Sequence, residues 1–277
     1  MGIKFSGRSS DFITPSFGFG CLLNCSYCYL KRHKPKGLDY ATNVADILTE
    51  INNHSYFMGV DKPNQTHESL ITYDISCNED FALHSKYYNW KMIFDFFKNH
   101  DLAMATFATK IVPKEFLEYD PNQKVRIRFS LMPQKISSIL EPNTSLIKDR
   151  ISAINDFKNA GYDVHINFSP VVIYSGWLED YKELFEQVNQ SVLNKYKKDV
   201  KAEVIFLTHN ALKHQHNLAY NLPGENILWV PQHQETKVSQ YGGHNIRYNT
   251  RLKAESILKF KKLHKSIIPW NTIRYIF

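Results

Sequence analysis

Short apolar runs alternate with amphipathic segments from Leu70 onward, and this alternation constrains the fold more than any other feature of the 277-residue sequence. Runs with a period of about two residues predict strands, and intervening segments with a period of about 3.6 predict the helices that connect parallel strands. We predict strands at residues 70–76, 103–109, 125–131, 164–172 and 202–207. Helices are predicted between them at residues 85–99, 113–119, 145–160 and 177–195.

An earlier unit fits the same pattern, with a strand near residues 13–19 and a helix at residues 40–52. Repeated strand–helix units predict an α/β fold, here an incomplete (β/α)6 TIM-like barrel with a small C-terminal appendage. In such barrels the chemistry lies on the loops that follow the carboxyl ends of the strands. The residues after each predicted strand are therefore the candidates for a functional site.

The C-terminal part of the sequence breaks the alternation. Residues 221–250 are rich in Gly, Gln, His and Asn, and a basic helix is predicted at residues 251–265. We expect a lead-in at residues 1–12, the barrel at residues 13–220, and an extension of hairpin and helix at residues 221–277. This extension is a candidate contact with nucleic acid.

Charge and cysteine usage narrow the possible partners and the location. A net charge of +7 and a pI of about 9.0 favour an anionic partner such as nucleic acid. The N-terminus lacks the apolar core of a signal peptide, and no run of about 18 apolar residues occurs, so we expect a soluble protein with no membrane partner. The expected location is the cytoplasm, or the host cytoplasm if the chain is viral. Four Cys in such a chain suit metal or redox chemistry better than disulfides.

Three of these cysteines, Cys21, Cys25 and Cys28, have the spacing CxxxCxxC. Short spacings in one loop let several thiolates reach different irons of one [4Fe–4S] cluster, which normally takes four thiolates. With three local ligands, one iron stays open, much as a catalytic zinc keeps an open position, and the amine and carboxylate of an amino acid can chelate it. The alternative is a zinc site made of the three Cys and a His such as His33.

This spacing, with the aromatic Tyr27 just before the third Cys, resembles the radical S-adenosylmethionine superfamily. The resemblance implies a barrel of the radical S-adenosylmethionine type, with a [4Fe–4S] cluster on Cys21, Cys25 and Cys28 and S-adenosylmethionine as cofactors. It also implies an external electron donor of the flavodoxin or ferredoxin type. Reductive cleavage of S-adenosylmethionine then gives methionine and a 5′-deoxyadenosyl radical, while the protein orients the reactants and excludes water.

From about Cys21 to Tyr181 the sequence also resembles the spore photoproduct lyase family, which splits a thymine–thymine photoadduct in DNA. The resemblance implies that Tyr27 and Tyr29 help to return a hydrogen atom, and that Cys77, at the end of the strand predicted at residues 70–76, donates it. A weak S–H bond at a strand end suits that role. The alternative for Cys77 is a buried, inert core thiol.

The resemblance places cofactor contacts at Lys110 and Ser130, two predicted strand ends. Lys110 offers a cation to a carboxylate, and the alternative is a solvated strand-end lysine. Two residues after the matching Ser the family has Asn, where this chain has Met132, so an amide contact is lost or is supplied from elsewhere.

Two further features concern the ends of the sequence. Only about twenty residues precede the cysteine motif, so we expect a trimmed relative of the lyases. In residues 241–248, a predicted hairpin, Arg247 and Tyr248 are candidate substrate residues, because stacking and phosphate contacts need these side chains. A plain Gly-rich turn is the alternative.

These patterns predict a radical S-adenosylmethionine enzyme that abstracts hydrogen from a thymine-derived base, with DNA or a modified thymine nucleotide as its partner. One alternative is a phage-type radical isomerase in thymine hypermodification of viral DNA, whose substrate radical recovers hydrogen from 5′-deoxyadenosine. A second is a radical enzyme on a non-nucleic substrate such as a sugar, because fold and cofactor do not fix the substrate. A third is a non-catalytic zinc module that binds nucleic acid.

Overall fold

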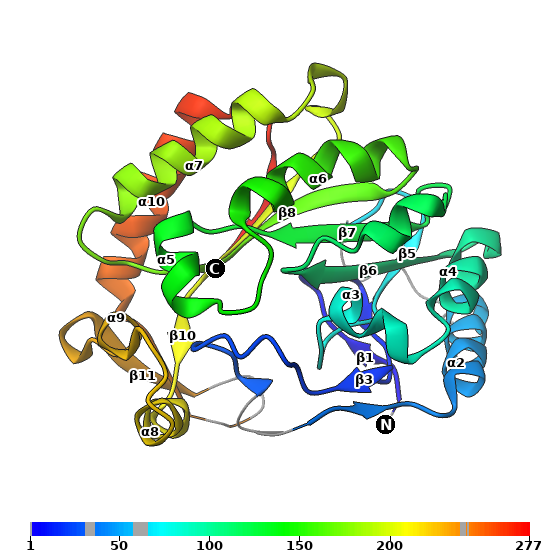
Figure 1. Ribbon diagram of the computed structural model, residues 1–277, viewed down its shortest axis with the longest axis horizontal. Helices are drawn as coiled ribbons and strands as arrows, with labels where there is room; N and C mark the ends of the chain where they lie inside the picture. The colour runs from blue at the N-terminus through cyan, green and yellow to red at the C-terminus, as the bar shows by residue number, and fades with distance from the viewer. Residues whose placement is uncertain (1, 31–36, 58–65, 239–241, 243) are drawn as a thin grey trace.

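One curled, eight-stranded sheet is the frame of this computed structural model, which describes residues 2–30, 37–57, 66–238, 242 and 244–277. In sheet order the strands are β1 (Lys4–Phe5), β2 (Phe12–Ile13), β5 (Ile71–Asp74), β6 (Ala103–Thr109), β7 (Val125–Ser130), β8 (Asp163–Val171), β9 (Ala202–Phe206) and β13 (Ile273–Ile276). Pairing is antiparallel between β1 and β2 and parallel from β2 to β13. The sheet curls into an incomplete TIM-like barrel (Figure 1), which confirms the predicted fold class.

Helices cover the convex face of the sheet, as Figure 1 shows. The longer ones are α2 (Val44–Phe57), α4 (Trp90–Asn99), α6 (Ile147–Asn159), α7 (Trp177–Ser191) and α10 (Thr250–Ile267). Helix α6 buries Ile147, Ile151 and Ile154, whose spacing places them on one face of a helix. None of the described helices is both long enough and apolar enough to cross a membrane.

The remaining helices and sheets are short. The short helices are α3 (Phe81–His84), η1 (Ser85–Tyr87), η2 (Lys114–Glu118), α5 (Gln134–Leu140), η3 (Asn194–Tyr196), α8 (Ala211–Ala219), α9 (Glu225–Leu228) and η4 (Pro231–His233). A two-stranded sheet pairs β3 (Gly18–Phe19) with β4 (Asp39–Tyr40). A three-stranded sheet has the order β10 (Thr208–His209), β12 (His244–Tyr248), β11 (Gln234–Val238).

The strands β5 to β9 confirm the predictions for this region within three residues at each end. Several predicted elements were wrong in extent. The helix predicted at residues 40–52 is α2, at Val44–Phe57, and the helix predicted at residues 177–195 ends at Ser191. The first strand ends at Ile13, and Gly18–Phe19 pair in a separate sheet. Residues 113–119 form only the 3₁₀ helix η2. The helix expected at residues 85–99 is divided because Tyr88 is extended, with its hydroxyl bound to Glu79 at 3.0 Å.

The C-terminal segment contains the predicted hairpin, with β11 antiparallel to β12, although residues 239–241 and 243 of its turn lie outside the described residues. Beyond it, α10 packs on α7, and β13 joins the barrel sheet next to β9. The sheet therefore takes its last strand from beyond residue 220, while the division of the chain at that residue stays a prediction.

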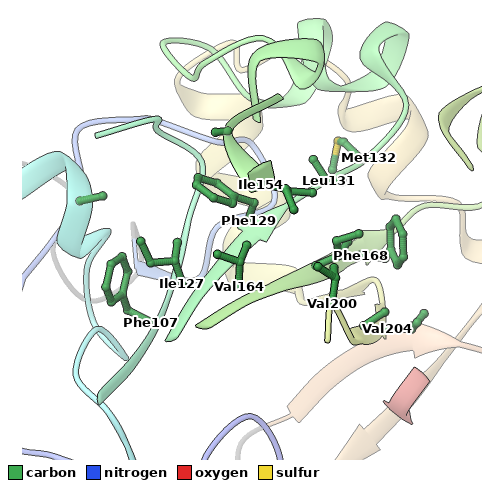
Figure 2. Close-up of a cluster of buried hydrophobic side chains, with 14 of the residues drawn as sticks. Phe107, Ile127, Phe129, Leu131, Met132, Ile154, Val164, Phe168, Val200 and Val204 are labelled. Atoms are coloured by element: carbon green, nitrogen blue, oxygen red, sulfur yellow. The ribbon is translucent and has the colours of Figure 1, made fainter. Parts of the chain in front are cut away.

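The core lies between the sheet and its helices. In Figure 2, Ile127 and Phe129 of β7 lie in one packed layer with Ile154 of α6. Successive strand residues face opposite sides, so Arg128 and Ser130 face the interior of the barrel and are also buried. The apolar layer stabilises the fold by roughly 1.5–3 kcal/mol for each large side chain buried. The polar residues on the other face of the sheet therefore line the interior of the barrel, where the candidate site is expected.

Candidate active site at the mouth of the barrel

The three cysteines of the CxxxCxxC motif lie in residues 20–30, here called the cysteine loop. Its start is shaped by Gly20, whose φ of 105° lies in the left-handed region that favours glycine. The loop is fixed to the carboxyl end of the barrel by two backbone hydrogen bonds, from Gly20 N to Asn78 O at 3.0 Å and from Ser26 N to Leu140 O at 2.9 Å. The loop thus lies beside the residues that follow β5 and β7, as the barrel prediction requires.

All three loop thiols are free, and burial raises the pKa of two of them, Cys21 and Cys25. Burial, with a smaller contribution from Asp80, raises the pKa of Cys21 to about 12. Burial also raises the pKa of Cys25, with Lys110 acting in the opposite direction. Metal ligation needs thiolates, so binding at this loop would release protons.

Cys77 follows β5 and lies next to the cysteine loop. The hydroxyl of Tyr29 donates to the backbone oxygen of Cys77. Burial raises the pKa of the Cys77 thiol to about 11, and Asp74 adds to this effect. Tyr29 remains 43% exposed. The structure therefore brings together Cys77, as a protonated thiol, and Tyr29, whose ring is open to an incoming ligand.

Tyr27 points to a different set of partners. Its hydroxyl donates to the Glu141 carboxylate, which also accepts from Ser137 Oγ at 3.0 Å and from Arg150 Nη1 at 3.0 Å. The side chains of Glu141 and Arg150 are both buried. The Lys110 ammonium lies 5.7 Å from the centre of the Tyr27 ring. We call Tyr27, Lys110, Glu141 and Arg150 the loop network.

Lys110 is not a solvated strand-end lysine. Burial acts to lower its pKa, but Glu141 and Cys25 outweigh burial, and the pKa of Lys110 is raised. Its backbone N–H donates to Asp80 at 2.9 Å. A half-buried cation thus faces the cysteine loop, at the position predicted for a cofactor contact.

Ser130, the other predicted cofactor contact, is buried at the end of β7. Its Oγ has no hydrogen-bond partner among the described residues, and neither has Arg150 Nη2. The other guanidinium nitrogen, Arg150 Nη1, donates to Ser130 O at 2.8 Å, so the two polar groups are neighbours. Buried groups left without partners cost about 1–3 kcal/mol each. Two donors at one place fit a carboxylate, and the residues present therefore fit an amino-acid cofactor. Met132 is buried and offers no amide.

The stretch after Cys77 adds two acidic residues that the sequence reasoning did not assign. Asp80 accepts from Thr109 Oγ1 at 2.7 Å and begins α3 by accepting from Leu83 N. Glu79 accepts from His84 Nδ1 at 3.1 Å through one oxygen, while the other has no partner among the described residues. Burial raises the pKa of Glu79. A Cβ at Gly18 would lie 2.3 Å from the Glu79 carboxylate, so this approach requires glycine.

The two candidate substrate residues of the hairpin differ in their surroundings. Tyr248 is a core residue, 2% exposed, and its hydroxyl accepts from Ile173 N at 2.8 Å. This placement corrects its assignment as a stacking residue, because the ring has no open face. Arg247 is half-buried and pairs with Glu235 at 2.7 Å, and its contact with substrate stays a prediction. His33, the alternative zinc ligand, lies outside the described residues.

An incomplete parallel barrel with a CxxxCxxC loop at its mouth defines a protein of the radical S-adenosylmethionine class. Within that class, the chain belongs to the spore photoproduct lyase family, which it matches over residues 2–277. It is 29% identical over 210 residues to the spore photoproduct lyase of Bacillus subtilis (strain 168), covering 73% of this chain and 58% of the relative. For the lyase of Clostridium acetobutylicum the identity is 26% over 200 residues, covering 68% and 57%. The chain thus spans less than two thirds of these relatives' length.

Solved structures show the same fold. A spore photoproduct lyase complexed with dinucleoside spore photoproduct has a TM-score of 0.87 at 20% identity, over 99% of this chain and 79% of that chain. A variant of the lyase with bound AdoMet and dinucleoside spore photoproduct has a TM-score of 0.86 at 20% identity, with the same coverage. This similarity extends through the C-terminal segment, including β13.

Proposed function

We propose that this chain is a radical S-adenosylmethionine enzyme that acts on a thymine-derived base in DNA, as a spore photoproduct lyase does. One observation carries the proposal: the cysteine loop lies directly beside Cys77, with the Tyr29 hydroxyl bound to the Cys77 backbone. A thiol hydrogen donor is of use only where a substrate radical can reach it. The cysteine loop and Cys77 lie at the same mouth of the barrel, which satisfies that requirement.

The residues present fit the expected cofactors. Cys21, Cys25 and Cys28 would hold a [4Fe–4S] cluster with one iron open for S-adenosylmethionine. The unpartnered Ser130 Oγ and Arg150 Nη2 would bind a carboxylate beside that loop. When bound, these cofactors supply the 5′-deoxyadenosyl radical that removes hydrogen from the substrate.

The chain's own residues would then control the return of hydrogen. Cys77 would donate the hydrogen atom of its S–H bond to the substrate radical. Tyr29, half-exposed and bound to the Cys77 backbone, would orient this thiol and take part in the relay. The hydroxyl of Tyr27 is directed to Glu141, so a joint relay of the two tyrosines would need that bond to break.

The substrate and partners follow from charge and from the relatives. A net charge of +7 favours DNA or a modified thymine nucleotide. The solved relatives bind dinucleoside spore photoproduct, which motivates a thymine photoadduct as the first substrate to test. An external flavodoxin or ferredoxin would deliver the electron, and the cytoplasm would be the site of action.

A second candidate function is the isomerase of modified thymine. The observation that favours it is the buried Met132, which stands where the family has an amide and cannot replace its hydrogen bonds. A changed cofactor contact suits a changed reaction on the same scaffold. In this alternative the substrate radical recovers hydrogen from 5′-deoxyadenosine, so the cofactor is regenerated.

The test is anaerobic reconstitution followed by incubation with reductant, S-adenosylmethionine and DNA that bears either the photoproduct or a modified thymine. Mass spectrometry then measures 5′-deoxyadenosine and the nucleosides. Conversion of the photoproduct to thymine supports the lyase. Rearranged nucleoside without net loss of S-adenosylmethionine supports the isomerase. Zinc without iron or sulfide after anaerobic purification contradicts both.

Two variants separate the roles of the cysteines. Cys77→Ala should still cleave S-adenosylmethionine but should no longer give clean thymine. Cys28→Ala is its matched control at the cysteine loop, and it should lose both iron and cofactor cleavage. A normal thymine yield from Cys77→Ala would exclude Cys77 as the hydrogen donor.

A further inference from the structure

Helix α8 contacts the cysteine loop, although the two segments are far apart in the sequence. Lys213 Nζ donates to Tyr27 O at 3.1 Å, and Asn217 Nδ2 donates to Ser26 O at 2.8 Å. Both side chains are buried, at 7% and 1% exposure. Figure 1 shows the blue loop that follows β3 running toward β10 and α8. The two carbonyls that α8 binds belong to the residues between Cys25 and Cys28.

Asn217 is held in place by a buried acidic anchor. Glu225 accepts from Asn217 through one oxygen, and through the other from His209 Nε2 at 2.9 Å and from His214 Nδ1 at 2.6 Å. Trp229 stacks on His214 with ring centres 4.2 Å apart. An amide nitrogen has two hydrogens, and Asn217 gives them to Ser26 O and Glu225. Its orientation is therefore fixed from both sides.

The same three side chains, His209, His214 and Glu225, have ligand atoms within 4.8 Å of one another, close enough for a metal ion. Their separations of 2.6 and 2.9 Å are hydrogen-bond distances, so the three groups satisfy each other without a cation. A metal-bound His usually donates its other ring nitrogen to an acceptor. His209 Nδ1 is buried and has no such partner among the described residues. The triad therefore serves as the anchor of Asn217.

Lys213 adds charge as well as hydrogen bonds. Its ammonium also donates to Thr208 O at 3.2 Å, which ties β10, the strand that follows β9 in the chain, to the cysteine loop. Charge, hydrogen bonding and solvent exposure set the reduction potential of an iron–sulfur cluster. A buried cation favours the reduced, more negative state, and the effect is stronger in the low dielectric of the interior than in water.

We propose that Lys213 and Asn217 are positioning residues for the cluster: both fix the backbone between Cys25 and Cys28, and the charge of Lys213 makes the cluster easier to reduce. This inference rests on the proposed function, because it assumes that the cysteine loop holds a [4Fe–4S] cluster. The fixed backbone itself is a property of the cluster-free chain, and it can be measured separately.

The test uses four variants of the full chain. Lys213→Gln removes the charge and keeps a donor, Lys213→Arg keeps the charge, and Asn217→Ala removes the amide. Lys135→Gln is the matched control, since its side chain is 70% exposed. Hydrogen exchange of residues 20–30 is measured on the cluster-free protein, and the midpoint potential is measured on the reconstituted protein by electron paramagnetic resonance.

Asn217→Ala should speed exchange in the cysteine loop by about tenfold or more, because the opening of this segment becomes easier. Lys213→Gln should lower the midpoint potential by about 59 mV, a tenfold change in the ratio of reduced to oxidised cluster for a one-electron couple. Lys213→Arg should restore the parent potential, and Lys135→Gln should change neither quantity. A merely structural role for Lys213 would not give this rescue by charge.

Parent-like exchange in Asn217→Ala would overturn the positioning role, and a parent-like potential in loaded Lys213→Gln would overturn the role of its charge. If Lys213→Gln folds but loads no cluster, faster exchange of the loop supports positioning and unchanged exchange contradicts it. If the unsubstituted chain binds no iron and sulfide, the proposed function fails. The exchange result still tests separately whether Asn217 fixes the backbone of the cysteine loop.

Discussion

Two of the buried networks of charged residues in the barrel differ in how completely the protein satisfies them. The interior network comprises Asp74, Arg128, Glu203 and Arg274, which connect β5, β7, β9 and β13 across the barrel. Arg128 pairs with Asp74 at 2.6 Å and with Glu203 at 3.2 Å, and Arg274 pairs with Glu203 at 3.1 Å. No buried polar side-chain atom of these four residues lacks a partner among the described residues.

The loop network, in contrast, is incomplete. Arg150 Nη2 and the adjacent Ser130 Oγ are buried without partners. Both networks have buried ion pairs, so burial of charge alone does not distinguish structure from function. The difference lies in the unsatisfied donors. The interior network is completed by the protein and holds the fold, whereas the donors that the loop network leaves open lie beside the cysteine loop, where the proposed cofactor would bind.

The largest expected effect on stability comes from a substitution that breaks the interior network. Arg128→Met leaves Asp74 and Glu203 buried without their main counter-ion, which costs about 3–5 kcal/mol when one partner of a buried pair is removed. The free energy of unfolding, measured by urea denaturation, should fall by that amount. The matched control is Arg251→Met, which removes an exposed pair with Glu255 worth about 0.5 kcal/mol at most. Equal losses in both variants would contradict a structural role for the interior network.

An intermediate effect concerns the pH dependence of two buried carboxylates. Burial raises the pKa of Glu203, but Arg128 and Arg274 outweigh it and lower that pKa. Its contribution to stability is therefore present above the unfolded pKa of about 4.3 and is lost as the pH falls through the folded pKa. For Glu79 burial raises the pKa, so its contribution is present below the unfolded value and is lost as the pH rises through the folded pKa.

Glu203→Gln should therefore lower the free energy of unfolding at pH 7 by about 2–3 kcal/mol and should flatten its decline in acid. Glu79→Gln should leave it within about 1 kcal/mol of the parent, or raise it. Urea titrations at a series of pH values measure both. A Glu79→Gln variant as unstable as Glu203→Gln would mean that the Glu79 carboxylate is as well compensated as the interior network.

The sequence predicted the parts of the molecule that depend on local pattern. Strand periodicity found β5 to β9, and the strand-end rule placed Cys77 beside the cysteine loop. The strand β13 was missed, because residues 221–277 were assigned as a whole to an extension of hairpin and helix. Tyr248 was taken for a substrate residue because stacking on a nucleic acid needs an aromatic side chain, whereas its hydroxyl is bound to Ile173 N, 75 residues away, in the core.

Four polar residues around the cysteine loop could not be found in this way: Glu141, Arg150, Lys213 and Asn217. Glu141 meets Tyr27 across 114 residues of sequence, and Lys213 and Asn217 meet the cysteine loop across 186 and 191 residues. A polar side chain that is buried by a distant partner has the same local sequence as one that lies in water. The one local signal is Asn210, which accepts from Lys213 N and so marks the start of α8.

The smallest effect on stability should come from substitution of Tyr29. Comparing Tyr29 with Tyr27 tests the difference between a half-exposed side chain and one that belongs to the buried loop network. Tyr29→Phe removes a hydroxyl from a half-exposed ring, and water can replace that donor at Cys77 O, so the free energy of unfolding should fall by less than about 1 kcal/mol. Tyr27→Phe leaves the buried Glu141 one donor short and should cost about 1–3 kcal/mol.

The order of the two variants should reverse in the product analysis. Tyr29→Phe should give more incompletely repaired nucleoside than Tyr27→Phe, because of the two tyrosines only Tyr29 is bound to Cys77. Equal product distributions from the two variants would assign both tyrosines to the same relay, and the Tyr27–Glu141 bond would then have to open during turnover.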